Sequence, residues 1–264
     1  MTDLTLNDGR TMPQLGMGVY KIPQPQTAAI VRKGIDIGFR LVDTAAFYGN
    51  ERGVGEGVHG TDTFVTTKLW NDRHGDAAVA LDESLALMGR DSIDLYLIHW
   101  PIPRENRYVE AWRALIAARD AGKTRSIGVC NFLPEHLDRI IDATGVTPAV
   151  NQIELHPSFQ QRDVQAYDAD HGIVTQSWSP LGQGATLKDD RIVAIADRHH
   201  RSPAQVIIAW HLAKGLSVIP KAGDADHLTD NFAAADLTLD ADDVAAIDAM
   251  DAPDGRIGPD PREL

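Results

Sequence analysis

Eight short apolar segments, each followed by a stretch of helical character, recur along the chain from residue 19 onwards. The expected strands are 19–21, 40–43, 63–68, 93–99, 125–130, 149–153, 173–178 and 216–220. The expected helices are 27–37, 51–58, 76–88, 108–121, 134–143, 162–170, 192–197, 203–214, 225–234 and 241–250. Such alternation predicts a parallel sheet, because parallel strands need crossover connections. Eight units in 264 residues is the usual size of a (β/α)8 TIM barrel, so we predict one barrel domain over residues 1–264.

A short hairpin is expected in front of the barrel, because segments 4–6 and 10–12 flank the turn Asn7-Asp8-Gly9. The structural alternative is a doubly wound open sheet. Against it, the first strand–helix turn (19–26) contains no glycine-rich phosphate loop. The glycines of segment 53–57 have the wrong spacing for such a loop and do not directly follow a strand. We interpret this segment as a tightly packed helix.

Composition excludes several classes of partner. The formal net charge is −13, whereas nucleic-acid binding needs clustered Lys and Arg, so no nucleic-acid partner is expected. The apolar runs are too short to cross a bilayer and no secretory signal is recognisable, so we predict a cytoplasmic protein without membrane contact. One cysteine, Cys130, excludes an internal disulfide framework. The acidic run from Asp236 to Asp251 is expected to form the solvated face of a C-terminal helix.

Polar or aromatic residues stand at the C-terminal ends of most expected strands. They are Asp43, Lys68, His99, Asn131, Gln152, Trp178 and Lys221. Each has a structural explanation when taken alone, such as a capped loop, a surface lysine or a packed histidine. Barrel enzymes, however, build their sites from the C-terminal ends of several strands. The joint occurrence therefore predicts a functional site on that face.

Asp43, Tyr48, Lys68 and His99 form a coherent proton-transfer group, and we predict that these four are catalytic. A free phenol titrates near ~10, which is high for an acid that works at neutral pH. An ammonium group at Lys68 would favour the phenolate and lower the pKa of Tyr48, while Asp43 would hold Lys68 charged and in place. His99 would orient a substrate carbonyl. This chemistry requires no metal, and none is predicted.

Several separated motifs occur in an order and spacing that resemble the aldo-keto reductase family along nearly the whole chain. They include Asp43-Thr44-Ala45-Ala46-Phe47-Tyr48-Gly49-Asn50-Glu51 and the segments 15–18, 66–70, 94–101, 126–132, 151–157 and 219–221. Segments 70–74 and 179–184 carry a narrower likeness to bacterial 2,5-diketo-D-gluconate reductases.

The resemblance implies a monomeric barrel enzyme that reduces aldehydes and ketones, including diketones or keto sugars, with NADPH. It implies that the nicotinamide donates hydride to the carbonyl carbon and that Tyr48 protonates the oxygen. Asn131 and Gln152 would bind the carboxamide, Trp178 would stack on the nicotinamide, and Ser179, Leu181 and Gln183 would line the pyrophosphate and ribose. The full set of implied cofactor contacts is Val19, Tyr20, Asp43, Cys130, Asn131, Gln152, Trp178, Ser179, Leu181, Gln183, Lys221, Ala222, His227 and Asn231. The implied substrate contacts are Tyr20, Tyr48, Trp70, His99 and Trp100.

Three positions depart from the family pattern. Cys130 replaces a serine that helps hold the carboxamide, and a thiol is the weaker donor. Ala222 and His227 replace a Ser or Thr and an Arg around the 2′-phosphate, so both the hydroxyl and the bidentate guanidinium are lost. We therefore predict that NADPH is accepted with a weaker preference over NADH than the family norm. The short polar tail after Met250 predicts an open pocket for small, polar or varied carbonyls.

Two other functions compete with carbonyl reduction. One is a non-catalytic NADP(H)-binding accessory or redox-sensing protein on the same barrel, since fold alone does not establish activity. The other is a phosphate-binding barrel isomerase with its phosphate site beyond strands seven and eight. The latter leaves Asp43, Tyr48, Lys68 and His99 unexplained, and all four catalytic positions are present. The sequence therefore favours the reductase.

Overall fold

A computed structural model describes residues 2–264, and it confirms the predicted (β/α)8 barrel with an N-terminal hairpin. The hairpin pairs β1 (Asp3–Thr5) with β2 (Thr11–Pro13) in antiparallel register. The barrel strands are β3 (Met17–Gly18), β4 (Leu41–Asp43), β5 (Phe64–Leu69), β6 (Ile93–Ile98), β7 (Thr124–Cys130), β8 (Val150–Glu154), β9 (Val174–Trp178) and β10 (Ser217–Val218). Each pairs with the next in parallel. Parallel bridges from Leu15 to Val218 and from Gly18 to Lys221 close the barrel.

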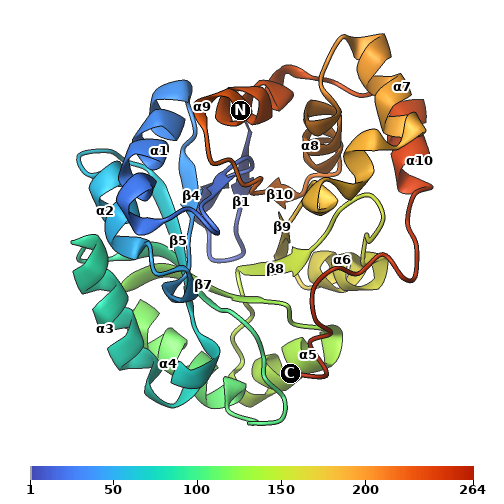
Figure 1. Cartoon of the computed structure of the whole chain (residues 1–264). Coiled ribbons are helices and arrows are strands. Elements are labelled where there is room, and N and C mark those ends of the chain that lie inside the picture. The colour runs from blue at the N-terminus through green and yellow to red at the C-terminus, as the bar shows by residue number, and fades with distance from the viewer. Residues whose placement is uncertain (1) are drawn as a thin grey trace.

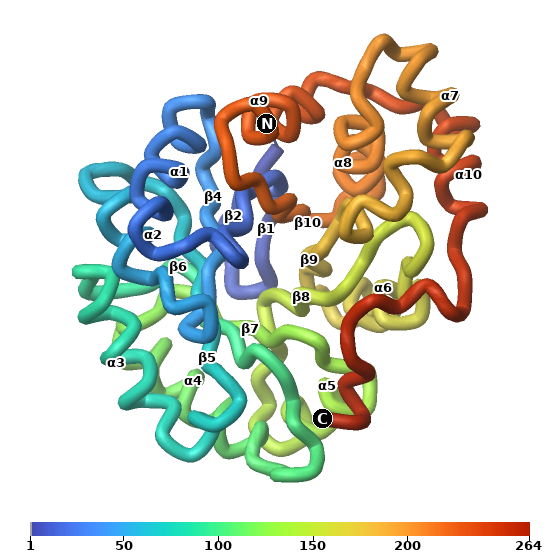
Figure 2. The backbone as a smooth tube through the Cα atoms, in the orientation of Figure 1, coloured from blue at the N-terminus to red at the C-terminus, as the bar shows by residue number. Residues whose placement is uncertain are grey.

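Helices surround the strands on the outside (Figure 1). They are α1 (Gln24–Ile37), α2 (Glu51–Val58), α3 (Ala77–Met88), α4 (Tyr108–Asp120), α5 (Pro134–Thr144), α6 (Arg162–Asp170), α7 (Asp190–His199), α8 (Pro203–Ala213), α9 (Ala225–Ala233) and α10 (Ala241–Asp248). Figure 2 traces the chain after α10, where it runs past α6 and ends near α5. The tail therefore runs along one side of the barrel.

The first barrel strand lies two residues earlier than the sequence predicts. At the closing seam the N–H of Gly16 donates to Val218 O, and that of Gly18 donates to Pro220 O. A Cβ on Gly18 would lie 3.1 Å from Ile219 O, so the close approach favours glycine. Lys21 adopts φ 61°, which ends the extended conformation. Residues 19–21 thus form the exit of the strand.

The glycines of α2 are explained by helix packing. A Cβ on Gly53 would lie 2.7 Å from Thr27 Cβ, and one on Gly57 would lie 2.6 Å from Val31 Cβ, both on α1. A Cβ on Gly55 would overlap the backbone of Met88 at the end of α3. The glycines let α2 approach both neighbouring helices closely, as the interpretation of a tightly packed helix requires.

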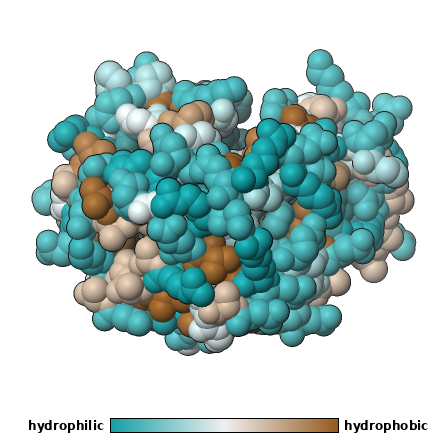
Figure 3. Space-filling view, turned by 90° about the horizontal axis from the view of Figure 1, so that it is seen from below, coloured by the Kyte–Doolittle hydropathy of each residue, from teal (hydrophilic) through white to brown (hydrophobic). Residues whose placement is uncertain are grey.

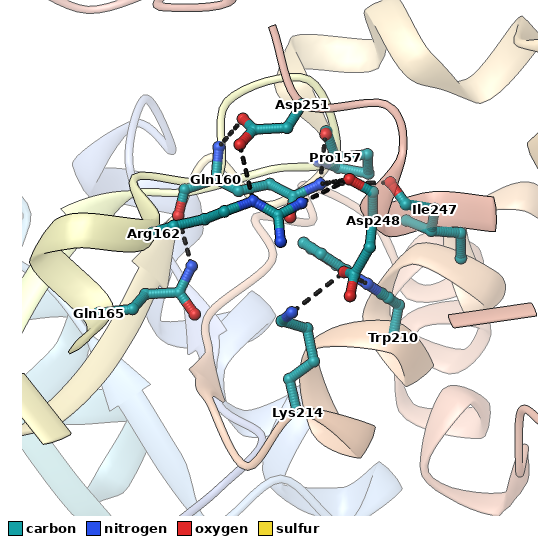
Figure 4. Close-up of polar contacts among 9 residues, drawn as sticks. All are labelled: Pro157, Gln160, Arg162, Gln165, Trp210, Lys214, Ile247, Asp248 and Asp251. Atoms are coloured by element: carbon teal, nitrogen blue, oxygen red, sulfur yellow. Dashed lines mark hydrogen bonds and ion pairs between the residues drawn. The ribbon is translucent and has the colours of Figure 1, made fainter. Parts of the chain in front are cut away.

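The expectation that the acidic run of the C-terminal helix forms a solvated face was wrong at two carboxylates. Asp243 is fully buried and accepts hydrogen bonds from Arg198 and from His199 Nε2, the latter at 2.7 Å. Asp248 Oδ1 accepts from Trp210 Nε1 at 2.9 Å and from Lys214 Nζ at 3.0 Å (Figure 4). Both carboxylates fasten α10 to α7 and α8.

The start of the tail is tied to the loop between β8 and α6. Asp251 accepts a hydrogen bond from Gln160 N at 2.9 Å and one from Arg162 Nε at 3.0 Å (Figure 4). The side chain of Gln160 donates to the carbonyl oxygens of Ile247 and Asp248, both at 3.2 Å. These bonds cap the end of α10 and direct the following residues towards the barrel mouth.

The face seen in Figure 3 is mostly hydrophilic, and its hydrophobic residues form small separate groups. Among residues 2–264, no helix has the length and apolar character needed to cross a membrane.

Asp168 on α6 provides a test of how pH acts on the fold. It is fully buried and accepts from Thr175 Oγ1 at 2.8 Å and from Asn151 Nδ2 at 3.2 Å. Burial raises the pKa of this carboxyl from 3.8 to about 7. The unfolded chain releases this proton at lower pH than the folded chain. The contribution of Asp168 to stability should therefore fall as pH rises from about 4 to about 7.

Asp168→Asn cannot ionise, so its advantage over the wild type should grow with pH and reach on the order of 2–4 kcal/mol at pH 8. Urea unfolding of both proteins at pH 5 and pH 8 measures this difference. The exposed Asp170 of the same helix supplies the control, since Asp170→Asn should show no such dependence. An advantage of Asp168→Asn that is equal at both pH values would contradict the prediction.

Candidate active site

A cavity of about 290 Å³ opens at the C-terminal ends of the barrel strands. The structure brings many of the predicted site residues together around it: Tyr20, Asp43, Tyr48, Trp70, His99, Trp100, Asn131, Gln152, Trp178, Ser179, Gln183 and Lys221. Other predicted residues do not line the cavity: Val19, Lys68, Cys130, Leu181, Ala222, His227 and Asn231. The lining also includes residues that sequence reasoning missed: Gly18, Phe47, Ile219, Gly258 and Pro259.

Asp43, which lines the cavity, forms a buried ion pair with Lys68, which does not. Their strands β4 and β5 are neighbours, and Lys68 Nζ lies 2.6 Å from Asp43 Oδ1. The same ammonium donates to Thr44 O at 2.8 Å. Burial lowers the pKa of Lys68, but Asp43 and the other nearby groups together outweigh this effect, so the pKa is raised. Lys68 therefore keeps its charge at neutral pH.

Tyr48 lies above this pair in a short 3-10 helix, η1 (Ala46–Tyr48). Lys68 Nζ is 5.2 Å from the centroid of its ring, and the ring of Tyr20 packs beside it at 4.9 Å. Burial raises the pKa of Tyr48, and the charge of Lys68 offsets only part of this increase. The predicted net lowering was therefore wrong, because enclosure of the phenol outweighs the ammonium. The hydroxyl is protonated at neutral pH and can act as a donor.

His99 follows β6 and faces the edges of two aromatic rings. Its imidazole lies 5.1 Å from the Trp70 ring and 5.9 Å from the Tyr48 ring, measured between centroids. Burial and the nearby charge of Lys68 hold the pKa of His99 well below its usual range. Its Nδ1 is buried and has no hydrogen-bond partner within residues 2–264. A neutral imidazole in the cavity wall carries one N–H, which can donate to a carbonyl oxygen.

Asn131 and Gln152 present amide groups beside Trp178. Asn131 adopts φ 61°, which asparagine tolerates, and donates to His99 O at 3.0 Å. Its Oδ1 accepts from Trp178 Nε1 at 2.8 Å. Gln152 Nε2 donates to Asp43 Oδ2 at 2.8 Å, whereas its Oε1 accepts nothing from the described residues. One amide hydrogen of Asn131 and the Oε1 of Gln152 thus remain available to a ligand amide.

The loop after β10 contains the cation Lys221 and the acid Asp224, and sequence reasoning missed the acid. Lys221 is exposed, Ala222 is buried and His227 is exposed. Asp224 begins α9, accepts from His227 N at 2.9 Å and lies 2.6 Å from His227 Nδ1. An aspartate just before a helix is a common N-cap, so this signal was present in the sequence. His227 is therefore engaged by a carboxylate at the place where the family pattern has a free arginine.

The tail contributes to the cavity wall, and the openness of the pocket stays a prediction. Gly258 and Pro259 line the cavity. The N–H groups of Ile257 and Gly258 donate to the two carboxylate oxygens of Glu154 at 2.6 and 2.8 Å. Glu154 is buried at the end of β8. Phe47 and Trp70 also line the cavity, and their rings stack with centroids 3.8 Å apart.

Comparison with known proteins gives a consistent result. The model of the aldo/keto reductase family matches residues 12–252. The methylglyoxal reductase DkgA of Salmonella typhimurium is 46% identical over 270 residues, which cover 100% of this chain and 98% of that protein. An aldo-keto reductase of Mycobacterium sp. (strain JLS) is 44% identical, with 98% and 96% covered.

Solved structures agree with these sequence relatives. The structure of a Gox0644 variant in complex with NADPH superposes with a TM-score of 0.98 at 50% identity and covers 100% of this chain and 98% of that one. An aldo-keto reductase of Bombyx mori in complex with NADP gives a TM-score of 0.88 at 33% identity, with 95% and 92% covered. The fold, the strand-end residues and these relatives agree, and the chain belongs to the aldo/keto reductase family.

Proposed function

We propose that this protein reduces aldehydes and ketones to alcohols, with NADPH as the hydride donor and Tyr48 as the proton donor. The observation that carries this proposal is the placement of Tyr48 and His99 on one cavity above the buried Asp43–Lys68 pair. Relatives named as methylglyoxal reductases support a small dicarbonyl as one substrate. No described feature specifically favours the non-catalytic accessory function.

The residues present fit a nicotinamide cofactor. Asn131 has a free amide hydrogen and Gln152 a free acceptor oxygen, so the two complement a carboxamide group. Trp178 supplies a flat face beside them, and Ser179 and Gln183 continue the same wall. Lys221 adds a positive charge that suits a phosphate. When bound there, NADPH supplies hydride to the substrate carbonyl carbon.

Tyr48 and His99 act on the carbonyl oxygen. The neutral His99 donates a hydrogen bond that orients the carbonyl, and the Tyr48 hydroxyl transfers its proton to the oxygen as the alcohol forms. The phenolate left on Tyr48 is stabilised by the ammonium of Lys68, whose position Asp43 fixes. The raised pKa of Tyr48 keeps the proton on the phenol until charge develops on the substrate.

The test is a turnover assay. Purified protein is mixed with NADPH and, separately, with NADH, then with methylglyoxal, aromatic aldehydes, α-diketones and keto sugars, and loss of reduced-cofactor absorbance is followed. We expect turnover of several of these compounds with NADPH. Tight NADPH binding without turnover of any compound would favour the accessory function and would contradict the proposal.

The residues of the loop after β10 predict only a modest preference for NADPH over NADH. Wild-type kcat/KM values with NADPH and NADH should lie much closer together than in enzymes that place an arginine here. A preference of several orders of magnitude for NADPH would contradict this. His227→Arg adds a permanent bidentate donor and should raise the NADPH-to-NADH ratio of kcat/KM about tenfold, the effect of one charge-assisted hydrogen bond. His59→Arg, at the end of α2, adds the same charge elsewhere and should leave the ratio unchanged.

We also propose that the chain acts as a monomer in the cytoplasm. Its net charge of −13 opposes self-association. Cys130 is buried and unpaired, which fits a reducing compartment. Sedimentation equilibrium across a range of concentrations tests the first point, and a stable dimer would contradict it.

A further inference from the structure

A chain of buried polar side chains crosses the barrel interior, and two of its members, Gln152 and Asp43, line the cavity. It begins at Ser217 on β10, passes through Gln176 on β9 and Gln152 on β8, and ends at the Asp43–Lys68 pair. All five side chains are buried. Gln176 stands opposite Ser217 in one strand pair and opposite Gln152 in the next, so the three lie at one level of the barrel. The proposed mechanism assigns no role to Gln176.

Two acceptors fix the amide orientation of Gln152. Its Nε2 donates to Asp43 Oδ2 at 2.8 Å and to Gln176 Oε1 at 2.7 Å, which uses both amide hydrogens. A flipped amide would set its oxygen against the carboxylate of Asp43 and the oxygen of Gln176, and both contacts would be repulsive. Gln152 therefore points its nitrogen at Asp43 and leaves its oxygen for the cavity.

Gln176 is itself held in one orientation. Its Nε2 donates to Ser217 Oγ at 2.9 Å, which turns its oxygen towards Gln152. Without an acceptor at this place, one N–H of Gln152 would be buried and unpaired, a state that folded proteins avoid. Gln152 would then move or flip to find a partner. Either change would disturb both the cavity-facing oxygen and the donor to Asp43.

We propose that Gln176 is a positioning residue for the active site. It fixes the amide of Gln152, and it thereby sets both the acceptor offered to the nicotinamide carboxamide and the hydrogen bonding of Asp43, which holds Lys68 next to Tyr48. This inference rests on the proposed function, in which Gln152 binds the cofactor. Gln176 touches neither cofactor nor substrate and acts only through Gln152.

The first experiment uses Gln176→Met, which keeps a side chain of similar length and removes the acceptor. Gln176→Leu is made in parallel, so the result does not depend on one variant folding. Both should weaken NADPH binding about tenfold, measured by quenching of protein fluorescence, and lower kcat by a similar factor. The KM for the carbonyl substrate should stay within twofold. Ser217→Ala removes only the partner of the Gln176 nitrogen. The N–H of Gln152 still selects the oxygen of Gln176 as its acceptor, so the Kd for NADPH should change less than threefold.

A double-mutant cycle separates positioning from general packing. If Gln176 acts only through Gln152, then adding Gln176→Met to Gln152→Met should cause no further loss of NADPH affinity or kcat. Additive losses, or equal losses in Ser217→Ala and Gln176→Met, would overturn the proposal. Unchanged NADPH affinity in the Gln176 variants would also overturn it. If the wild type binds NADPH but turns over no carbonyl, the proposed function fails, and the cycle still tests Gln176 through the Kd alone.

Discussion

Replacing Tyr48 by phenylalanine is expected to lower kcat for carbonyl reduction about 10²- to 10⁴-fold, the usual contribution of a general acid. The change removes the hydroxyl and keeps the ring that packs on Tyr20. The Asp43–Lys68 pair stays intact below it, and the proposed cofactor contacts lie on other strands. The Kd for NADPH should therefore remain within about threefold of the wild-type value.

Tyr96→Phe provides the matched control for this variant. Tyr96 is buried, whereas Tyr48 is half-buried, and the hydroxyl of Tyr96 has no hydrogen-bond partner among residues 2–264. It does not line the cavity, so loss of its hydroxyl should leave kcat unchanged. If Tyr48→Phe retained most of its activity, the assignment of the acid would be wrong. Steady-state kinetics of both variants and fluorescence titration with NADPH decide the matter.

Replacing Lys68 by methionine should affect both stability and activity. The variant leaves the Asp43 carboxyl buried without its cationic partner, and breaking a buried pair in this way costs about 3–5 kcal/mol of unfolding free energy. It also removes the charge that stabilises the phenolate of Tyr48, so kcat should fall at least about 10²-fold. Urea unfolding and initial rates measure the two effects separately.

The double variant Asp43→Asn with Lys68→Met separates these two roles of Lys68. It contains no unpaired buried charge, and replacing a whole ion pair by neutral groups is often tolerated. Most of the lost stability should therefore return, while kcat should stay as low as in Lys68→Met. Recovery of activity together with stability would show that Lys68 is needed only for folding, which would contradict its role beside Tyr48.

Much of the site could be predicted from the sequence because the barrel topology places strand ends together. Once eight strand–helix units were recognised, Asp43, His99 and Gln152 had to meet on one face, whatever the loop conformations. The pairing of Asp43 with Lys68 followed from their places at the ends of consecutive strands. The family resemblance supplied the proposed cofactor roles of Asn131 and Trp178, which composition and spacing alone would not have given.

The other features of the site depend on side-chain burial and on contacts between distant parts of the chain, which a sequence pattern does not contain. The pKa of Tyr48 depends on how completely the phenol is enclosed, and Lys68 alone suggested the opposite direction. Glu154 accepts a hydrogen bond from Gly258, which lies 104 positions later in the chain, and no local sequence pattern predicts such a contact. Gln176 reads as an ordinary interior strand residue until its two amide partners are known.

The tail wall has a consequence for how this site can change over time. Glu154 accepts hydrogen bonds from the main-chain N–H groups of Ile257 and Gly258, so these contacts do not depend on which side chains the tail carries. Two tail glycines are constrained: a Cβ on Gly258 would lie 2.7 Å from Trp178 and 2.9 Å from Glu154, and a Cβ on Gly255 would overlap the main-chain oxygen of Ser158. Substitutions elsewhere in the tail can reshape the rim of the pocket while the barrel and its proton-transfer residues stay untouched. The part of the cavity lining that the tail supplies can therefore change independently of the proton-transfer residues.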